Sequence, residues 1–257
     1  MKGFVFVAGV LLSGAVAYAQ ASTSRATAST AAPPGWDATA ARLMDLELDG
    51  KLEERVAIVE PFVVKYPLFA DGHARLGAAH ETVARGLMRT DPTRARARFE
   101  IAATHMRRAF DLGGGTHPDA TIRGLIDLYE YALPSPDKWK ATVLDALARY
   151  PAQPVSHWYG LQFLLRDGRA AELGPALKSA RLAVPSTSSG ARLELAELIV
   201  GLAKKATSPE VRATLTREAL ALADETLAAH PNDGLGPRVA SIKEEGGRVQ
   251  SDGQSHP

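Results

Sequence analysis

The sequence His80-Glu81-Thr82-Val83-Ala84 begins like a zinc-protease helix, in which two histidines four residues apart bind the metal. Ala84 stands where the second histidine is required, so the motif is incomplete. His73 lies seven residues before His80, which places both imidazoles on one helix face two turns apart. No third histidine or matching carboxylate is evident, and a zinc site needs at least three protein ligands. We interpret both histidines as parts of a groove or a solvated face, without a metal.

Other motifs that could carry chemistry are incomplete too. Gly113-Gly114-Gly115 is not followed by Lys and Ser or Thr, as a phosphate-binding loop would be. The sequence has no Gly-x-Ser-x-Gly motif and no cysteine nucleophile. The acidic pairs Glu53-Glu54 and Glu244-Glu245 are adjacent, and neighbours on a helix diverge. We therefore expect no enzyme activity and no cofactor.

The densest basic stretch comprises Arg94, Arg96, Arg98 and then Arg107-Arg108. An anionic contact patch is one interpretation, and we favour the other, the solvated face of a long helix, because aromatic residues are not interleaved with the arginines. Asp and Glu number 29, and Lys and Arg number 30 with Lys2 included. A chain without Lys2 is formally neutral, so no global field attracts nucleic acid. We expect no nucleic-acid partner.

His157-Trp158-Tyr159 places three large amphipathic side chains in succession. On a helix they spread around most of the circumference, so at least one points away from the packed face. Trp158 either faces a binding groove, where Trp is a typical hot-spot residue, or fills the seam between neighbouring helices. If it faces a groove, Gln162 and Arg166 lie one and two turns along the same stripe.

The two ends of the chain differ from its middle. Lys2, the apolar run 4–16 and Ala17-Tyr18-Ala19 read as a secretory signal cleaved after Ala19, with an uncleaved anchor as the alternative. Residues 20–35 are rich in Ser, Thr, Ala and Pro and are expected to form a disordered linker. The Gly-rich stretch 246–257 is expected to be a disordered tail. The signal predicts a periplasmic or secreted bacterial protein, with no stable transmembrane segment after cleavage.

Between these ends the hydrophobic pattern is helical, with a period of 3.6 residues. One such face comprises Ile122, Leu125, Ile126, Tyr129 and Leu133, and another comprises Leu215, Ala219, Leu222, Ala223 and Thr226. Asp37 is a plausible N-cap for the first helix. Helix starts are also indicated where an N-cap residue precedes Pro, at Asp91-Pro92, Ser135-Pro136 and Ser208-Pro209.

Helix ends are indicated by Gly113-Gly114-Gly115 and by five residues that precede Pro. These five are Tyr66, His117, Tyr150, Val184 and His230. Gly50 stands 17 residues before Pro67, and Gly168 stands 17 residues before Pro185. Matched intervals of this kind indicate a repeated helix-turn-helix unit.

These features resemble the tetratricopeptide repeat, a pair of antiparallel helices A and B. Leu76-Gly77 falls nine and ten residues after Pro67, and Ala102, Met106 and Ala109 reproduce the small, bulky, small pattern of helix B. Ala146 and Ala180 precede a closing Pro by five residues, and Gly50 and Gly168 occupy the A–B turn. The match is degenerate, because His73, Trp139, Leu173 and Thr226 depart from the pattern. Another α-hairpin array is the alternative.

The resemblance implies an all-α fold, a right-handed α-solenoid of about five hairpins with a capping helix. The expected repeat domain is 36–245, with units at about 36–67, 68–118, 119–151, 152–185 and 186–231 and a cap at 232–245. The second and fifth units exceed the usual 34 residues, so we expect two long hairpins flanking two short ones.

In this family the A helices line a concave surface, which implies a non-enzymatic scaffold or adaptor in the bacterial envelope. It would bind a peptide or a protein in the groove. The candidate groove residues are Trp158, Gln162, Arg166, Tyr129, Glu81, Arg85 and Arg192. The alternative is a ligand-binding accessory subunit of an envelope transport or polysaccharide system.

Overall fold

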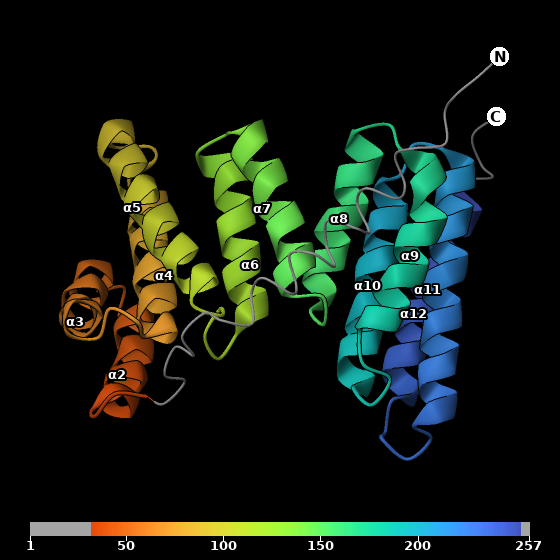
Figure 1. Cartoon of the computed structure of the whole chain (residues 1–257), viewed down its shortest axis with the longest axis horizontal. Helices are drawn as coiled ribbons and strands as arrows, with labels where there is room; N and C mark the ends of the chain where they lie inside the picture. The colour runs from red at the N-terminus through yellow and green to blue at the C-terminus, as the bar shows by residue number, and fades with distance from the viewer. Residues whose placement is uncertain (1–31, 253–257) are drawn as a thin grey trace. The chain divides into compact units, whose positions relative to one another are not determined.

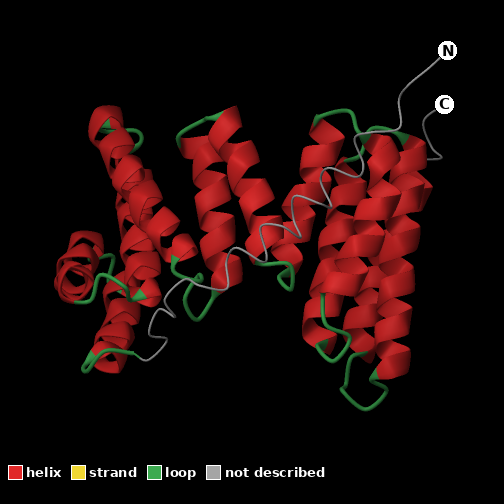
Figure 2. Cartoon of the chain, in the orientation of Figure 1, coloured by secondary structure: helices red, strands yellow, loops and turns green. Residues whose placement is uncertain are grey.

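The structure, a computed structural model, describes residues 32–252, and every regular element in that range is a helix (Figures 1 and 2). The expected leader and most of the linker lie outside the described residues, as do the last five residues. The elements are α2 (Trp36–Leu48), α3 (Leu52–Lys65), α4 (Ala70–Leu87), α5 (Pro92–Asp111), α6 (Pro118–Asp127), the π-helical turn η2 (Leu128–Ala132), α7 (Pro136–Arg149), α8 (Pro154–Arg166), the 3₁₀ turn η3 (Ala170–Glu172), α9 (Leu173–Ala183), α10 (Ser189–Lys205), α11 (Pro209–Ala229) and α12 (Gly236–Asp252). The all-α prediction is confirmed.

The predicted N-caps before Pro start helices as expected. The Asp91 side chain accepts a hydrogen bond from the Arg94 backbone N–H at 3.0 Å, at the start of α5. Ser208 accepts one from the Val211 N–H at 3.4 Å, at the start of α11. Such side chains satisfy backbone donors that have no partner within the helix.

Two predicted boundaries are wrong. His117 does not end a helix, because α5 already ends at Asp111 and Pro118 is the first residue of α6. The glycines 113–115 have φ values of 104°, 81° and 72°, a left-handed run that terminates α5 earlier.

Asp37 is not an N-cap, since α2 begins at Trp36. The buried Trp36 ring packs edge-on against Phe62 and Phe69, at 5.5 Å and 4.8 Å between centroids, which holds it in the helix.

The C-terminal cap is longer than predicted. It was expected to end at residue 245 before a disordered tail, but α12 continues to Asp252. A Cβ added at Gly246 would lie 3.1 Å from Leu220 Cδ2, and Val249 is buried. Gly246 therefore permits a close approach between α12 and α11, where the sequence alone indicated flexibility.

The described residues form two compact units, divided between Thr142 and Val143 inside α7. In the N-terminal unit α2 packs on α3, α3 on α4, α4 on α5, and α5 on α6. The contact between α4 and α5 is close because a Cβ added at Gly77 would lie 2.8 Å from Met106 Cγ and 3.1 Å from the Ala102 carbonyl oxygen. The small residue in the Leu76-Gly77 motif thus sets the distance between the two helices.

In the C-terminal unit α8 packs on α9 and α10, while α10, α11 and α12 pack against one another (Figure 1). The predicted stripe on α11 is its core face: Leu215, Ala219, Leu222, Ala223 and Thr226 are all fully buried. Ion pairs hold α12 in place, with Arg238 contacting Glu197 at 2.6 Å and Lys243 contacting Asp224 at 2.6 Å.

The predicted long hairpins are confirmed. Helices α4 and α5 have 18 and 20 residues, and α10 and α11 have 17 and 21, against 13 and 11 for α8 and α9 in one of the short units expected between them. Gly50 and Gly168 have φ values of 70° and 68° in the turns after α2 and α8. Among the described helices, none combines the length and the apolar character required to cross a membrane.

Candidate functional site

Three histidines gather between the long helices of the N-terminal unit. His73 and His80 on α4 are both largely buried, and His105 on α5 lies between their rings. The His73 and His105 Nδ1 atoms are 3.0 Å apart, and the His80 ring stacks on His105 with 3° between the planes. We call these three residues the histidine stack.

The hydrogen bonds of the stack determine which nitrogens carry protons. Arg98 Nη1 lies 3.0 Å from His80 Nδ1, and because a guanidinium only donates, His80 Nδ1 must accept. His73 Nε2 lies 3.2 Å from the Pro67 carbonyl oxygen and must donate to it. For neutral rings His73 Nδ1 then accepts, and the proton between the two Nδ1 atoms belongs to His105. With all three rings neutral, each of these hydrogen bonds has one donor and one acceptor.

Arg98 is fixed by an acidic residue on the neighbouring helix. Its Nη2 donates to both carboxylate oxygens of Glu53 on α3, at 2.8 Å and 3.1 Å. Arg94 adds a third hydrogen bond to Glu53 at 3.1 Å. Glu53 therefore bonds two arginines of the basic stretch, although its charge balances only one of them, and Arg98 connects α3 to the histidine stack.

The surroundings favour neutral imidazoles. Burial, with the charges of Arg98 and His105, lowers the pKa of His80 from its ordinary 6.5 to about 4. Burial lowers the pKa of His73, although its bond to the Pro67 carbonyl opposes this. Burial lowers the pKa of His105 also, against the opposing charge of Glu60.

The third histidine that the sequence did not reveal is His105. His73 and His105 lie equally far from Arg89 in the α4–α5 turn, as do His80 and Arg98. An antiparallel hairpin brings such residues opposite one another, so the matching seven-residue spacings on both helices were the available signal. The rings stack instead of converging on one point. Among the described residues no group of three or more His, Asp or Glu side chains could hold a metal ion.

A cavity of about 390 Å³ lies beside this network, open to solvent. Its lining comprises Gly50, Lys51, Leu52, Glu53 and Glu54 from the α2–α3 turn and the start of α3, with Val83, Gly86 and Leu87 from α4. Glu53 belongs both to the cavity wall and to the pair with Arg98. Leu52, Val83 and Leu87 make the wall apolar between the charged side chains.

The candidate residues Glu81 and Arg85 lie on another face of α4. At 100° per residue they are roughly opposite Val83, Gly86 and Leu87. They bond each other, with Arg85 Nη2 donating to Glu81 Oε1 at 2.6 Å. The structure therefore does not bring them to the cavity.

The candidates on α8 differ in exposure along their stripe. Trp158 is half-buried, with Lys205 Nζ of α10 lying 5.9 Å from its ring centroid. Gln162 is buried, and no described residue bonds its Oε1. Arg166 is exposed.

The neighbouring His157 is buried, and its Nε2 bonds the Pro151 carbonyl oxygen at 2.7 Å, just as His73 bonds Pro67. These two histidines therefore hold the turns that precede α8 and α4.

The remaining candidates, Tyr129 and Arg192, lie in different units. Tyr129 is half-buried in the π-helical turn η2, with Lys138 Nζ 5.6 Å from its ring centroid. Burial raises the pKa of Tyr129. The Arg192 side chain is mostly buried and its Nη2 lies 3.5 Å from Glu225 Oε2. The seven candidates are divided between the two units, and none of them lines the cavity.

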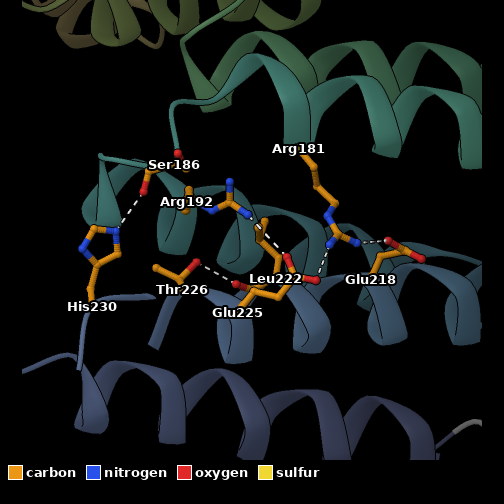
Figure 3. Close-up of polar contacts among 8 residues, drawn as sticks. All are labelled: Arg181, Ser186, Arg192, Glu218, Leu222, Glu225, Thr226 and His230. Carbon is orange, nitrogen blue, oxygen red and sulfur yellow. Dashed lines mark hydrogen bonds and ion pairs between the residues drawn. The ribbon is translucent and has the colours of Figure 1, made fainter. Parts of the chain in front are cut away.

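Arg192 belongs to a polar network across α9, α10 and α11 (Figure 3). Arg181 donates to Glu218 at 3.1 Å and also to Glu225.

His230 Nε2 bonds the Ser186 carbonyl oxygen at 2.8 Å (Figure 3), while its Nδ1 lies 3.4 Å from Asp233. Ser189 bonds Asp233 and not the histidine, at 3.0 Å. This Ser, His and Asp arrangement cross-links two loops and lacks the Ser–His contact of a catalytic triad.

Comparison with known protein families and with curated proteins finds no match.

Proposed function

We propose that the chain is a non-enzymatic scaffold of tetratricopeptide-like hairpins that binds an apolar segment of a protein partner. The hairpin lengths, the turn glycines and the contact of Gly77 with Ala102 and Met106 support the repeat. Repeat arrays of this kind commonly present binding surfaces. The leader-like residues 1–19 support a place in the bacterial envelope, where cell fractionation of the tagged protein tests it.

The observation that carries this proposal is the cavity beside Glu53. At about 390 Å³ it is near the lower end of ligand pockets, and it opens to solvent instead of enclosing a molecule. An open, partly apolar cavity suits one or two side chains projecting from a larger partner. Leu48 and Met88, close to the lining residues in sequence, are 86% and 54% exposed and extend the apolar character of this end of the unit.

Gly86 offers a direct test of the cavity. No described heavy atom lies within 4 Å of a Cβ added there, and the residue is helical with no positive φ. Gly86→Arg should fill the cavity while improving helix propensity by about 1 kcal/mol. The Gly86→Arg protein should no longer capture the specific protein partner from an envelope extract, while its thermal stability stays that of the unmodified protein.

The matched control is Gly247→Arg, an exposed helical glycine of α12 that likewise has open space around its Cβ. It should retain the partner. Equal capture by Gly86→Arg and the unmodified protein would reject the cavity as the binding site.

A second function, binding of a small molecule or glycan in a transport or polysaccharide system, is favoured by one observation. The buried Gln162 Oε1 has no partner among the described residues, and the half-buried Trp158 lies on the same stripe. A thermal-shift screen tests it, because a ligand at 100 times its dissociation constant stabilises by about 2.7 kcal/mol. Gln162→Leu should remove such a shift, and Gly86→Arg should not.

A further inference from the structure

We propose that the histidine stack is a proton-operated lock, which holds α4 against α5 at neutral pH and loosens this hairpin in acid. The proposal is independent of the partner and of the cavity. It rests first on the contact between His80 and Arg98, which has no place for an additional proton.

Protonation of His80 would set two donors against each other. Arg98 Nη1 and His80 Nδ1 are 3.0 Å apart, and this contact requires the lone pair of a neutral imidazole. A proton on Nδ1 converts the hydrogen bond into an approach of two cations. Arg98 cannot withdraw freely, because its other nitrogen is bound to both oxygens of Glu53.

The pair of His73 and His105 is limited in the same way. Only one proton can lie between Nδ1 atoms that are 3.0 Å apart, so the two rings cannot both be cations in this arrangement. His73 already uses Nε2 on the Pro67 carbonyl oxygen. A second proton on this pair therefore breaks the contact between the two rings, and with it a connection between α4 and α5.

The charged groups that face the stack come from both neighbouring helices. Helix α3 contributes Glu53 and Glu60, of which Glu53 is bound by Arg94 and Arg98. Helix α5 contributes Arg98 beside His80 and Arg108 near His73. Among the described residues, Glu60 favours protonation of His105 and the Pro67 carbonyl favours that of His73, but burial and the arginines oppose it, so the balance is against protonation of the folded cluster.

The direction of the pH dependence follows from the lowered pKa values. A histidine whose pKa is lowered by folding binds fewer protons in the folded than in the unfolded state. Its contribution to stability is complete above the unfolded value of 6.5 and is lost as the pH falls. For His80 the loss continues down to about pH 4.

Hydrogen exchange of the full chain at pH 7.5 and 5.0, corrected for intrinsic exchange, tests the lock. Amides of α4 and α5 should lose protection by about 30-fold, the factor given by the 1.5 pH units between 6.5 and 5.0 for a histidine whose folded pKa is about 4, while those of α10 and α11 change much less. Equal changes in both hairpins would overturn the proposal. So would full protection of α4 and α5 at pH 5.0.

His80→Gln is the test variant, because the glutamine amide oxygen can accept a hydrogen bond from Arg98 and the amide never carries a charge. It should reduce the pH dependence of protection in α4 and α5, whereas His117→Gln, at an exposed position before α6, should leave it unchanged. NMR titration of the unmodified protein keeps the test valid if the variant fails to fold. His80 should titrate below pH 5, and a titration near 6.5 would refute the lock.

Discussion

At the scale of single residues, the burial of a side chain and the groups it bonds decide its role, and the residue type alone does not. His73 and His157 each bond a carbonyl six residues earlier, at Pro67 and Pro151. The same residue type therefore serves as a turn clamp in both places, and in His73 it is also part of the stack. His80 differs because its ring accepts from Arg98.

Gly77→Ala should destabilise the protein by about 1–3 kcal/mol, the usual cost of overpacking. The added Cβ would lie 3.1 Å from the Ala102 carbonyl and 3.2 Å from the Met106 nitrogen, both backbone atoms of α5, which cannot turn aside as a side chain can. Urea unfolding followed by circular dichroism measures the change in the free energy of unfolding.

Gly201→Ala is the matched control for Gly77→Ala. Gly201 is inside α10, and no described heavy atom lies within 4 Å of a Cβ added there. The change should stabilise by about 0.5–1 kcal/mol through helix propensity alone. A destabilisation equal to that of Gly77→Ala would show that contact with α5 is not the cause.

At the scale of elements, local signals in the sequence predicted most helices and both long hairpins. Proline and N-cap pairs at 91–92 and 208–209 act on neighbouring residues, so they can be recognised without the fold. The role of Gly246 could not be recognised, because it depends on Leu220 of another helix. The stack was missed for the same reason, since it forms only when α4 and α5 pair in one register.

Asp91→Ala should destabilise the protein by about 0.5–2 kcal/mol, because it removes the acceptor for the Arg94 N–H at the start of α5. Asp91→Asn retains a capping oxygen and should restore most of the loss. Thermal unfolding of both variants at one pH provides the comparison. Identical melting temperatures for the Ala and Asn variants would contradict a capping role.

At the scale of the whole molecule, the two compact units have separate polar networks. The N-terminal unit contains the histidine stack and the cavity, and Glu53 links them because it lines the cavity and bonds Arg98, which contacts His80. The C-terminal unit contains the ion pairs of Arg181 and Arg192 with Glu225. The seven candidate residues lie at expected A-helix positions, but the cavity could not be predicted from the sequence, because its wall combines the α2–α3 turn with the far end of α4.

The central claim, that a protein partner occupies the cavity, is tested most directly by site-specific photo-crosslinking in the intact envelope. A photoreactive side chain replaces Gly86 in one protein and Gly247 in another, both at open positions. The account predicts a discrete crosslinked protein from position 86 and none from position 247. The claim would be contradicted if position 86 gave no crosslink while a photoreactive residue in place of Trp158 captured a protein.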